Sequence, residues 1–427
     1  MDIHRPFQGL GNHLGAALLI SVLTTGCGQA PTGDPGIDEP LTLASSLELT
    51  LGGLGGQDWQ AFGEVVRIAF DPQGRLIILD QSAARVHIVD PSGELIMSFG
   101  TRGEGPGELA FPLSIAATPS GEIVVYDASN RGFIRFDEQG EYLGNVPLDP
   151  STGMPGQSVL SHPEGGVVSV PVGVVFRGSG LEDTEDAALP VYHWELNSGA
   201  DDETPRAVTR AWRPSQEDLA TPVQVSGGIT LRAPPVVGFE PPVSLAVLSD
   251  GTLALVDSSA YRIRRIALDG SELEPLSRPL HPRPVTQQDR EADLARRLER
   301  LETGQAPRMQ ITTRGPGGGS TTLDQEAVRS ILRQQLEGMV FWTEVPVLRR
   351  IASDPQGRLW VERRGPSEDV PGATDIFSAQ GEYMGTLPGD RSWIPDALSP
   401  DGRGAYITRD ELDVVTIEIR RLELQEG

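Results

Sequence analysis

The sequence contains one cysteine, no lysine and few aromatic residues. Because Cys27 is the only cysteine in 427 residues, no intramolecular disulfide can form. Aromatic residues make up 5% of the chain, whereas 50 residues are glycine and 35 are proline. This composition suits short strands joined by tight turns and argues against a helical bundle.

Positive charge is also scarce. The 35 basic residues are all arginine, and 60 acidic residues bring the formal net charge to −25. A strongly acidic surface repels nucleic acid and anionic lipid headgroups, because both carry negative charge. We therefore expect no nucleic-acid partner, and membrane contact only through a covalent lipid.

The N-terminus has an apolar stretch, residues 14–23, that is too short to span a bilayer but fits the core of a secretory signal. The following Thr24-Thr-Gly-Cys27 resembles the lipobox of bacterial lipoproteins, in which the cysteine is acylated and becomes the mature N-terminus. The usual leucine three residues before the cysteine is Thr24 here, since Leu23 falls one place early. The alternative is an ordinary secretory peptide with a lone cysteine.

These features divide the chain into three parts. Residues 1–26 are predicted to be a lipoprotein signal peptide, and residues 27–44, rich in Gly, Pro and Asp, a flexible tether. Residues 45–427 form the folded body. We expect it to be exported and anchored by Cys27 in the bacterial cell envelope, facing the periplasm or the cell surface.

A turn motif recurs along the folded body, each copy between short runs rich in Val, Ile and Leu. Proline presets the turn dihedrals and glycine accepts a positive φ, which explains why these residue types recur. Self-similarity of this kind marks a repeat fold, here with a small antiparallel sheet as the unit. The motif occurs at residues 71–74, 118–121, 249–251, 354–357 and 399–402, and a second turn glycine follows at Gly93, Gly140 and Gly270.

The first unit predicts four strands, at residues 65–70, 76–79, 86–89 and 95–99. Further units follow at residues 114–146, 244–276 and 348–387, with a weaker one around the turn at 163–166 and a strand at 191–196. The last unit has three evident strands, near Ile394 and at residues 405–408 and 414–419. Residues 47–51 alternate suitably to supply its missing strand, so we expect N-terminal and C-terminal sequence to pair and close a ring.

Six four-stranded units around an axis predict an all-β fold, a six-bladed β-propeller. Residues 99–109, followed by Pro112, resemble the inter-blade segment of NHL-type propellers. Residues 77–80 with 85–89, and 255–257 with 262–263, are similar to strands of the same repeat. The resemblance is clear in blades one, two and four, partial in five and six, and poor in three. It implies the fold, whereas function is hardly constrained, because propellers host many unrelated activities.

The long segments of the chain all fall on one side of the predicted ring. In an up-and-down blade, the first and third turns share one rim, while the middle turn and the link to the next blade share the other. The recurring turns therefore define a short, plain face. The opposite rim, here named the elaborated face, carries residues 171–190, 212–242, 279–346 and 363–372, and is where we expect binding.

The largest insertion, residues 279–346 between blades four and five, predicts two helices. Thr286 can cap a helix over residues 289–301, and Asp324 can cap a second helix with an apolar stripe. We expect both to cover one side of the elaborated face. They could be a packing cap, a substrate lid or an arm that docks a partner.

Asp80, Asp127 and Asp257 end the second predicted strand in three blades, on the elaborated face. Together with Arg131 they are candidate ligand-binding residues, because converging carboxylates could hold a cation or a basic ligand. The alternative is structural, since each aspartate can cap its own turn by accepting backbone N–H bonds. An arginine follows each of these aspartates closely: Arg85, Arg131 and Arg262. An ion pair between the aspartate and the arginine of one blade would satisfy both charges.

No catalytic, cofactor or metal site emerges from the sequence. The six histidines do not cluster, and His162 and His193 are expected to be packed or solvated rather than metal ligands. Residues 100–107 lack the Lys-Ser/Thr of a P-loop, and no nucleophile elbow is present. We therefore expect a monomeric, lipid-anchored, non-catalytic propeller that binds a protein or small-molecule ligand through its elaborated face. The alternative is a lactonase-like or lyase-like enzyme acting at the central channel.

Overall fold

The computed structural model describes most of the chain beyond residue 36. The predicted signal peptide, Cys27 and the Asp324 cap lie outside the described residues, as does most of the predicted tether. The described ranges are 37–149, 152–172, 188–196, 205–212, 221–225, 229–233, 236–304, 310–312, 320–322, 325–410 and 412–425.

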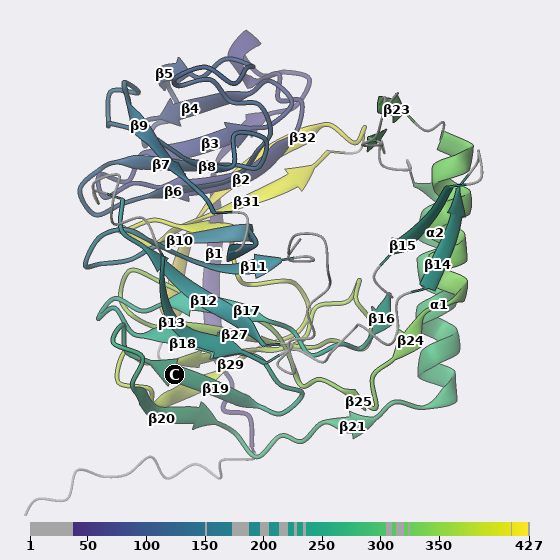
Figure 1. Cartoon of the computed structure of the whole chain (residues 1–427). Helices are drawn as coiled ribbons and strands as arrows, with labels where there is room; N and C mark the ends of the chain where they lie inside the picture. The colour runs from purple at the N-terminus through teal and green to yellow at the C-terminus, as the bar shows by residue number, and fades with distance from the viewer. Residues whose placement is uncertain are drawn as a thin grey trace, which may run out of the picture.

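Six four-stranded antiparallel sheets surround one axis, which confirms the six-bladed β-propeller (Figure 1). Blade one contains β2 (Val65–Phe70), β3 (Leu76–Asp80), β4 (Arg85–Val89) and β5 (Leu95–Phe99). Blade two contains β6 (Pro112–Ala117), β7 (Ile123–Asp127), β8 (Gly132–Phe136) and β9 (Tyr142–Pro147). Blade three contains β10 (Met154–Ser161), β11 (Val167–Val172), β12 (Leu189–Trp194) and β13 (Arg206–Ala211).

The last three blades follow the same order, with one exception in the sixth. Blade four contains β17 (Ser244–Val247), β18 (Leu253–Val256), β19 (Arg262–Ile266) and β20 (Glu272–Ser277). Blade five contains β26 (Leu348–Ser353), β27 (Leu359–Arg363), β28 (Thr374–Phe377) and β29 (Tyr383–Leu387). Blade six contains β30 (Ala397–Leu398), β31 (Arg403–Arg409), β32 (Val415–Gln425) and, as its outermost strand, β1 (Thr42–Gly52).

Strand β1 closes the ring as the alternation of residues 47–51 predicts. It pairs antiparallel with β32 from Thr42 opposite Gln425 to Gly52 opposite Thr416. Leu51 is buried in the core between blades six and one. Blade six is therefore assembled from both ends of the described chain, and the strand begins three residues before the expected boundary at residue 45.

The segment before β1 lies against blade five. Leu41 N donates to the Thr386 carbonyl at 2.9 Å, and Thr386 N donates to the Glu39 carbonyl at 2.7 Å. Asp38 forms ion pairs with Arg278 and Arg363, at 3.0 and 2.6 Å. The described end of the predicted tether is thus fixed to the outer edge of blade five.

The recurring turns lie on the plain face in the predicted conformation. Gly74 and Gly357 have φ of +76° and +81°, in the left-handed region that favours glycine. The opening aspartates cap the turns: Asp71 Oδ1 accepts from Arg75 N, and Asp354 Oδ1 accepts from Arg358 N. Arg403 follows the turn of blade six and donates to the Gly74 carbonyl of blade one at 3.0 Å.

The elaborated face carries two helices and several short strands outside the blades. The helices are α1 (Gln287–Thr303) and α2 (Gln325–Glu337), which stand together at the right of Figure 1. Thr286 caps α1 as predicted, in a capping box with Asp289. The accessory strands pair as β14 (Thr221–Val225) with β15 (Ile229–Ala233), β16 (Val237–Gly238) with β24 (Val340–Phe341), β21 (Arg283–Pro284) with β25 (Glu344–Val345), and β22 (Gln310–Thr312) with β23 (Ser320–Thr322).

Ion pairs attach α1 to the loop between β27 and β28 of blade five. Asp293 is buried and pairs with Arg296 and Arg297 of its own helix. Arg297 then reaches Glu368 of the loop at 3.1 Å. The insertion therefore contacts the β27–β28 loop, another long segment of the elaborated face. Together they cover one side of that face.

Candidate functional site

The first strands of the blades line a central channel with a volume of about 1140 Å³. Its lining combines apolar side chains with arginine, serine, aspartate and glutamate. A pocket of this size that mixes apolar walls with a few polar groups is typical of ligand sites in proteins.

Equivalent positions of five first strands carry polar residues near the elaborated end of the channel; four of them line it, and Ser114 is fully buried. Each stands four residues before the residue that opens the first turn of its blade, and proline occupies the sixth position. Because the blades repeat around one axis, these positions form a single tier. The tier consists of Arg67, Ser114, Ser158, Ser244, Arg350 and Pro395.

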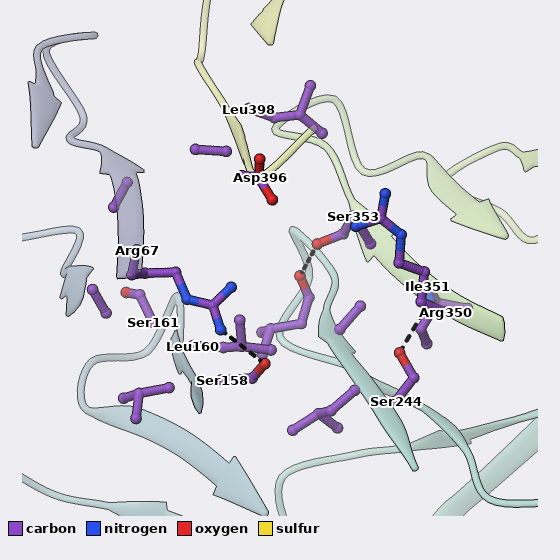
Figure 2. A pocket seen from close by; sticks show the side chains of 18 of the residues that line it. Arg67, Ser158, Leu160, Ser161, Ser244, Arg350, Ile351, Ser353, Asp396 and Leu398 are labelled. Carbon is purple, nitrogen blue, oxygen red and sulfur yellow. Dashed lines mark hydrogen bonds between the residues drawn. The ribbon is translucent and has the colours of Figure 1, made fainter. Parts of the chain in front are cut away.

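Hydroxyl groups of this tier join neighbouring blades. Ser114 Oγ accepts from Val159 N at 3.2 Å, linking blades two and three. Ser244 Oγ accepts from Ile351 N at 3.0 Å, linking blades four and five (Figure 2). These serines satisfy backbone donors at the channel wall, so part of the tier holds the ring together.

Arg67 and Asp396 bring opposite charges to the channel. Arg67 Nη2 donates to Ser158 Oγ at 3.2 Å, and Figure 2 shows Arg67 and Arg350 on opposite sides of the pocket with Asp396 between them. Burial lowers the pKa of the Arg67 guanidinium, and the Asp396 carboxylate offsets part of that shift. Asp396 Oδ2 also accepts from Ile407 N at 2.7 Å, which fixes its orientation.

Arg350 is held by a buried carboxylate behind the channel wall. Glu362 is fully buried, and its two oxygens accept from Arg349 and Arg350 at 2.9 Å each. Arg350 Nη2 also donates to Ser392 Oγ at 2.6 Å and to the Ile394 carbonyl at 2.8 Å. The guanidinium is thus rigidly placed beside the channel.

The predicted site residue Asp80 is buried beneath the loop that enters its own blade. It accepts from Gly63 N at 2.9 Å, Glu64 N at 3.2 Å and Ala83 N at 3.0 Å. Burial by itself would raise the pKa of Asp80, but these hydrogen bonds outweigh it and hold the pKa below its ordinary value. The geometry is that of a loop cap.

Asp127 has the same arrangement in blade two. It accepts from Ala110 N at 2.7 Å, Phe111 N at 3.0 Å and Asn130 N at 2.9 Å. Arg131 is exposed in the β7–β8 turn with φ of +50°, and its carbonyl accepts from Leu148 N. Among the ion pairs of the described residues, none joins Arg131 to Asp127.

Asp257 differs from the other two predicted aspartates. Its Oδ2 accepts from Trp212 N at 3.0 Å and from Arg264 Nη1 at 2.8 Å. The expected pairing with Arg262 is replaced by an ion pair with Arg264. The described lining of the channel includes none of the four predicted site residues, so their ligand-binding role stays a prediction.

The structure brings two of the histidines together. The rings of His162 and His193 lie 5.3 Å apart, both buried in blade three. His162 Nε2 contacts the Gly251 carbonyl and His193 Nε2 contacts the Gly165 carbonyl, each at 2.9 Å. Both are packed, as expected from the sequence. Within the described ranges, no group of three or more His, Cys, Asp or Glu residues is placed to hold a metal ion.

The tier around Arg67 was not predicted from the sequence. Its signal was present, because the polar residue recurs at a fixed distance before the first turn in five units. Aligning the units on their first strands, rather than on their second strands, would have revealed it.

Comparisons with known proteins agree with the fold. Residues 38–163, which include β1 and the first two blades, match the family model DUF5128, described as a 6-bladed beta-propeller. No curated protein matches the chain significantly. The described residues contain no helix long and apolar enough to cross a membrane.

Solved structures resemble the chain over most of its length at low identity. A protein of Bacteroides fragilis provisionally called an exported protein has 10% identity and a TM-score of 0.48, with 89% of this chain and 95% of that chain covered. A Bacteroides vulgatus member of the duf4221 family has 12% identity and a TM-score of 0.45, with 90% and 99% covered. A gluconolactonase of Xanthomonas campestris has 14% identity and a TM-score of 0.36, with 85% and 87% covered. These likenesses concern architecture alone.

Proposed function

We propose that this six-bladed propeller is a lipid-anchored binding protein of the bacterial cell envelope, and that its ligand enters the channel from the elaborated face. The observation that carries the proposal is the tier at that end of the channel. There, the Arg67 and Arg350 guanidinium groups and the Asp396 carboxylate face a space large enough for a small organic ligand. Rigid, oriented polar groups in an otherwise apolar wall provide specificity at little entropic cost.

The elaborated face supports entry from that side. Its loops differ from blade to blade, whereas the plain face consists of short capped turns. Loops on a rigid scaffold are the usual carriers of binding residues. A ligand that spans the channel mouth would contact the first strands below and the helical insertion at its edge.

A blocking substitution tests the channel. Ser158 is exposed toward the channel, so Ser158→Trp would fill the space beside Arg67, removing the hydrogen bond from Arg67 but no core packing. We expect the variant to lose small molecules that copurify with the wild type, as measured by mass spectrometry after denaturation. The control is Gln139→Trp, an equally bulky change on the plain face. Equal ligand content in Ser158→Trp and wild type would contradict the proposal.

The membrane anchor has a separate test. Cys27→Ala should move the protein from the membrane fraction to the soluble fraction, because one acyl-bearing residue would supply the attachment. A wild-type protein already found in the soluble fraction would contradict the anchor and leave the channel proposal standing.

The helical insertion offers a test of partner binding. Deleting residues 285–346 should abolish capture of an envelope partner while the propeller still unfolds cooperatively. Unchanged capture by the deletion variant would show that the insertion has no part in docking.

A further inference from the structure

A second hollow lies on the elaborated face, between blade four and the base of the helical insertion. Its volume is about 790 Å³, and two tryptophans line it. Trp212 follows β13 and is 46% exposed, while Trp342 follows β24. The two indole rings lie 5.5 Å apart at an interplanar angle of 66°. Residues of the β18–β19 turn complete the hollow, separate from the channel lining.

Hydrogen bonds hold the Trp342 indole and the Trp212 backbone in place, and the Trp212 ring packs edge-on against Trp342. Trp342 Nε1 donates to Ser259 Oγ at 3.2 Å, and Trp342 N donates to the Gly238 carbonyl at 2.9 Å. Trp212 N donates to Asp257 Oδ2 at 3.0 Å. The aromatic wall is therefore formed before any ligand arrives, which lowers the entropic cost of binding.

The charges around the hollow cancel. Asp257 and Glu344 carry negative charge, and Arg262 and Arg264 carry positive charge. The lining therefore has no net charge to attract an anion or a cation, and a charged ligand would lose hydration on entering without that compensation. A neutral ligand loses less hydration.

The hollow still offers groups for hydrogen bonding. Asp257 Oδ2 accepts two hydrogen bonds, whereas Oδ1 has no donor among the residues that the structure describes. Glu344 and Arg262 are exposed at the rim, one an acceptor and the other a donor. A ligand rich in hydroxyl groups can use all three.

From this combination we infer that the hollow binds a neutral carbohydrate chain. The exposed face of Trp212 carries the negative pole of the indole quadrupole and can pack against the C–H face of a sugar ring. The ring hydroxyls reach Asp257 Oδ1, Glu344 and Arg262. Because the rim is exposed, a chain of several sugars can continue beyond the hollow. This carbohydrate site is additional to the ligand proposed for the channel.

The repeat supplies a matched control residue. Phe111 stands before blade two as Trp212 stands before blade four, since Phe111 N donates to Asp127 as Trp212 N donates to Asp257. Phe111 is 47% exposed, almost the same as Trp212. It differs in having no aromatic partner among the ring contacts of the described residues.

Isothermal titration of the full-length protein with neutral hexasaccharides tests the inference. The probes are maltohexaose, cellohexaose and the hexamer of N-acetylglucosamine. We expect at least one to bind with a Kd of about 1 mM or tighter. Trp212→Ala should weaken that binding about tenfold or more, because the packing face is lost, whereas Phe111→Ala should leave it within about twofold. Arg262→Ala, a substitution at an exposed position, should also weaken hexasaccharide binding. This variant replaces Trp212→Ala in the test if Trp212→Ala fails to fold.

Three results would overturn the inference. One is the absence of binding by all three hexasaccharides, and another is equal binding by wild type, Trp212→Ala and Arg262→Ala. The third is binding of tetramethylammonium that depends on Trp212, which would make the hollow a cation site. Neither the loss nor the retention of hexasaccharide binding affects the Ser158→Trp test, so the channel proposal stands or falls separately.

Discussion

Asp38 Oδ1 lies 2.6 Å from Arg363 Nη2, so a residue of the predicted tether forms an ion pair with blade five. Arg363 and Arg278 also pair with Asp375, which is fully buried together with the hydroxyl of Tyr261. Asp38 therefore completes a charge cluster whose other members belong to the propeller.

We predict that Asp38→Asn loosens residues 37–41 from blade five. The hydrogen bond from Arg363 is the main reason that the pKa of Asp38 lies below its ordinary value. A lowered pKa in the folded state means that the pairing contributes fully above about pH 3.9 and is lost as the pH falls further. Hydrogen exchange of residues 38–41 should be faster in the variant near pH 7, and the difference should vanish in more acidic solution. Identical exchange at pH 7 would contradict the role of Asp38.

Ring closure predicts contrasting effects of two leucines in β1. Leu51 is 1% exposed between blades six and one, whereas Leu47 is 51% exposed. Leu51→Ala should lower the free energy of unfolding by about 2–5 kcal/mol, the usual cost of a cavity in a packed core. Leu47→Ala should change it by about 0.5 kcal/mol or less. Urea denaturation measures the free energy of unfolding of both variants. Similar decreases in the two variants would contradict the role of β1 as the closing strand.

Because Asp80 caps a loop, we expect its removal to lower the free energy of unfolding by an amount that depends on pH. Asp80→Ala leaves the N–H groups of Gly63, Glu64 and Ala83 without their acceptor, at a cost of about 1–3 kcal/mol. Because hydrogen bonds lower the pKa of Asp80, the difference from wild type should be full above about pH 4 and shrink below it.

Chemical denaturation at pH 7 and at pH 3 measures this effect. The matched control is Asp90→Ala, which removes an exposed turn cap that water can replace, so its effect should be smaller. If Asp90→Ala lowered the free energy of unfolding more than Asp80→Ala, burial of the Asp80 cap would not explain its contribution to stability.

The contact between α1 and blade five predicts a salt-sensitive insertion. Asp293 is buried and orients Arg296 and Arg297 toward the loop that contains Glu368 and Asp369. Asp293→Ala should release α1, because two arginines lose the carboxylate between them. Limited proteolysis should then cleave residues 287–303 faster, and high salt should produce a similar change in wild type. Glu291→Ala, an exposed change on the same helix, should have no such effect.

Much of the propeller could be predicted because its determinants are local. The glycine of each first turn needs a positive φ, and the flanking strands are short and apolar, so the blades can be recognised one by one. Even the closing strand was predictable. The sixth unit has only three evident strands, and residues 47–51 precede the first unit without a neighbouring strand in the sequence to pair with. The hairpin of β14 and β15 was missed, although alternating residues flank Gly227-Gly228, a hairpin signal.

The sites were less predictable because they depend on contacts between distant segments. Trp212 and Trp342 are 130 positions apart in the sequence and meet only when the insertion folds back over blade four. Asp257 looked equivalent to Asp80 and Asp127 by its place in the repeat. Its environment differs because the Arg264 guanidinium donates to it beside Trp212 N, whereas Asp80 and Asp127 each accept from several backbone N–H groups.

The pairing of β1 with β32 has a consequence for the order of synthesis. Thr42 emerges from the ribosome among the first residues of the propeller, whereas its partner Gln425 is among the last. Five blades can therefore assemble while β1 still lacks its partner, and the ring closes only after the final strand is released. Because a contact that spans nearly the whole chain has a high entropic cost of loop closure, closure of the sixth blade should be the slow step of folding.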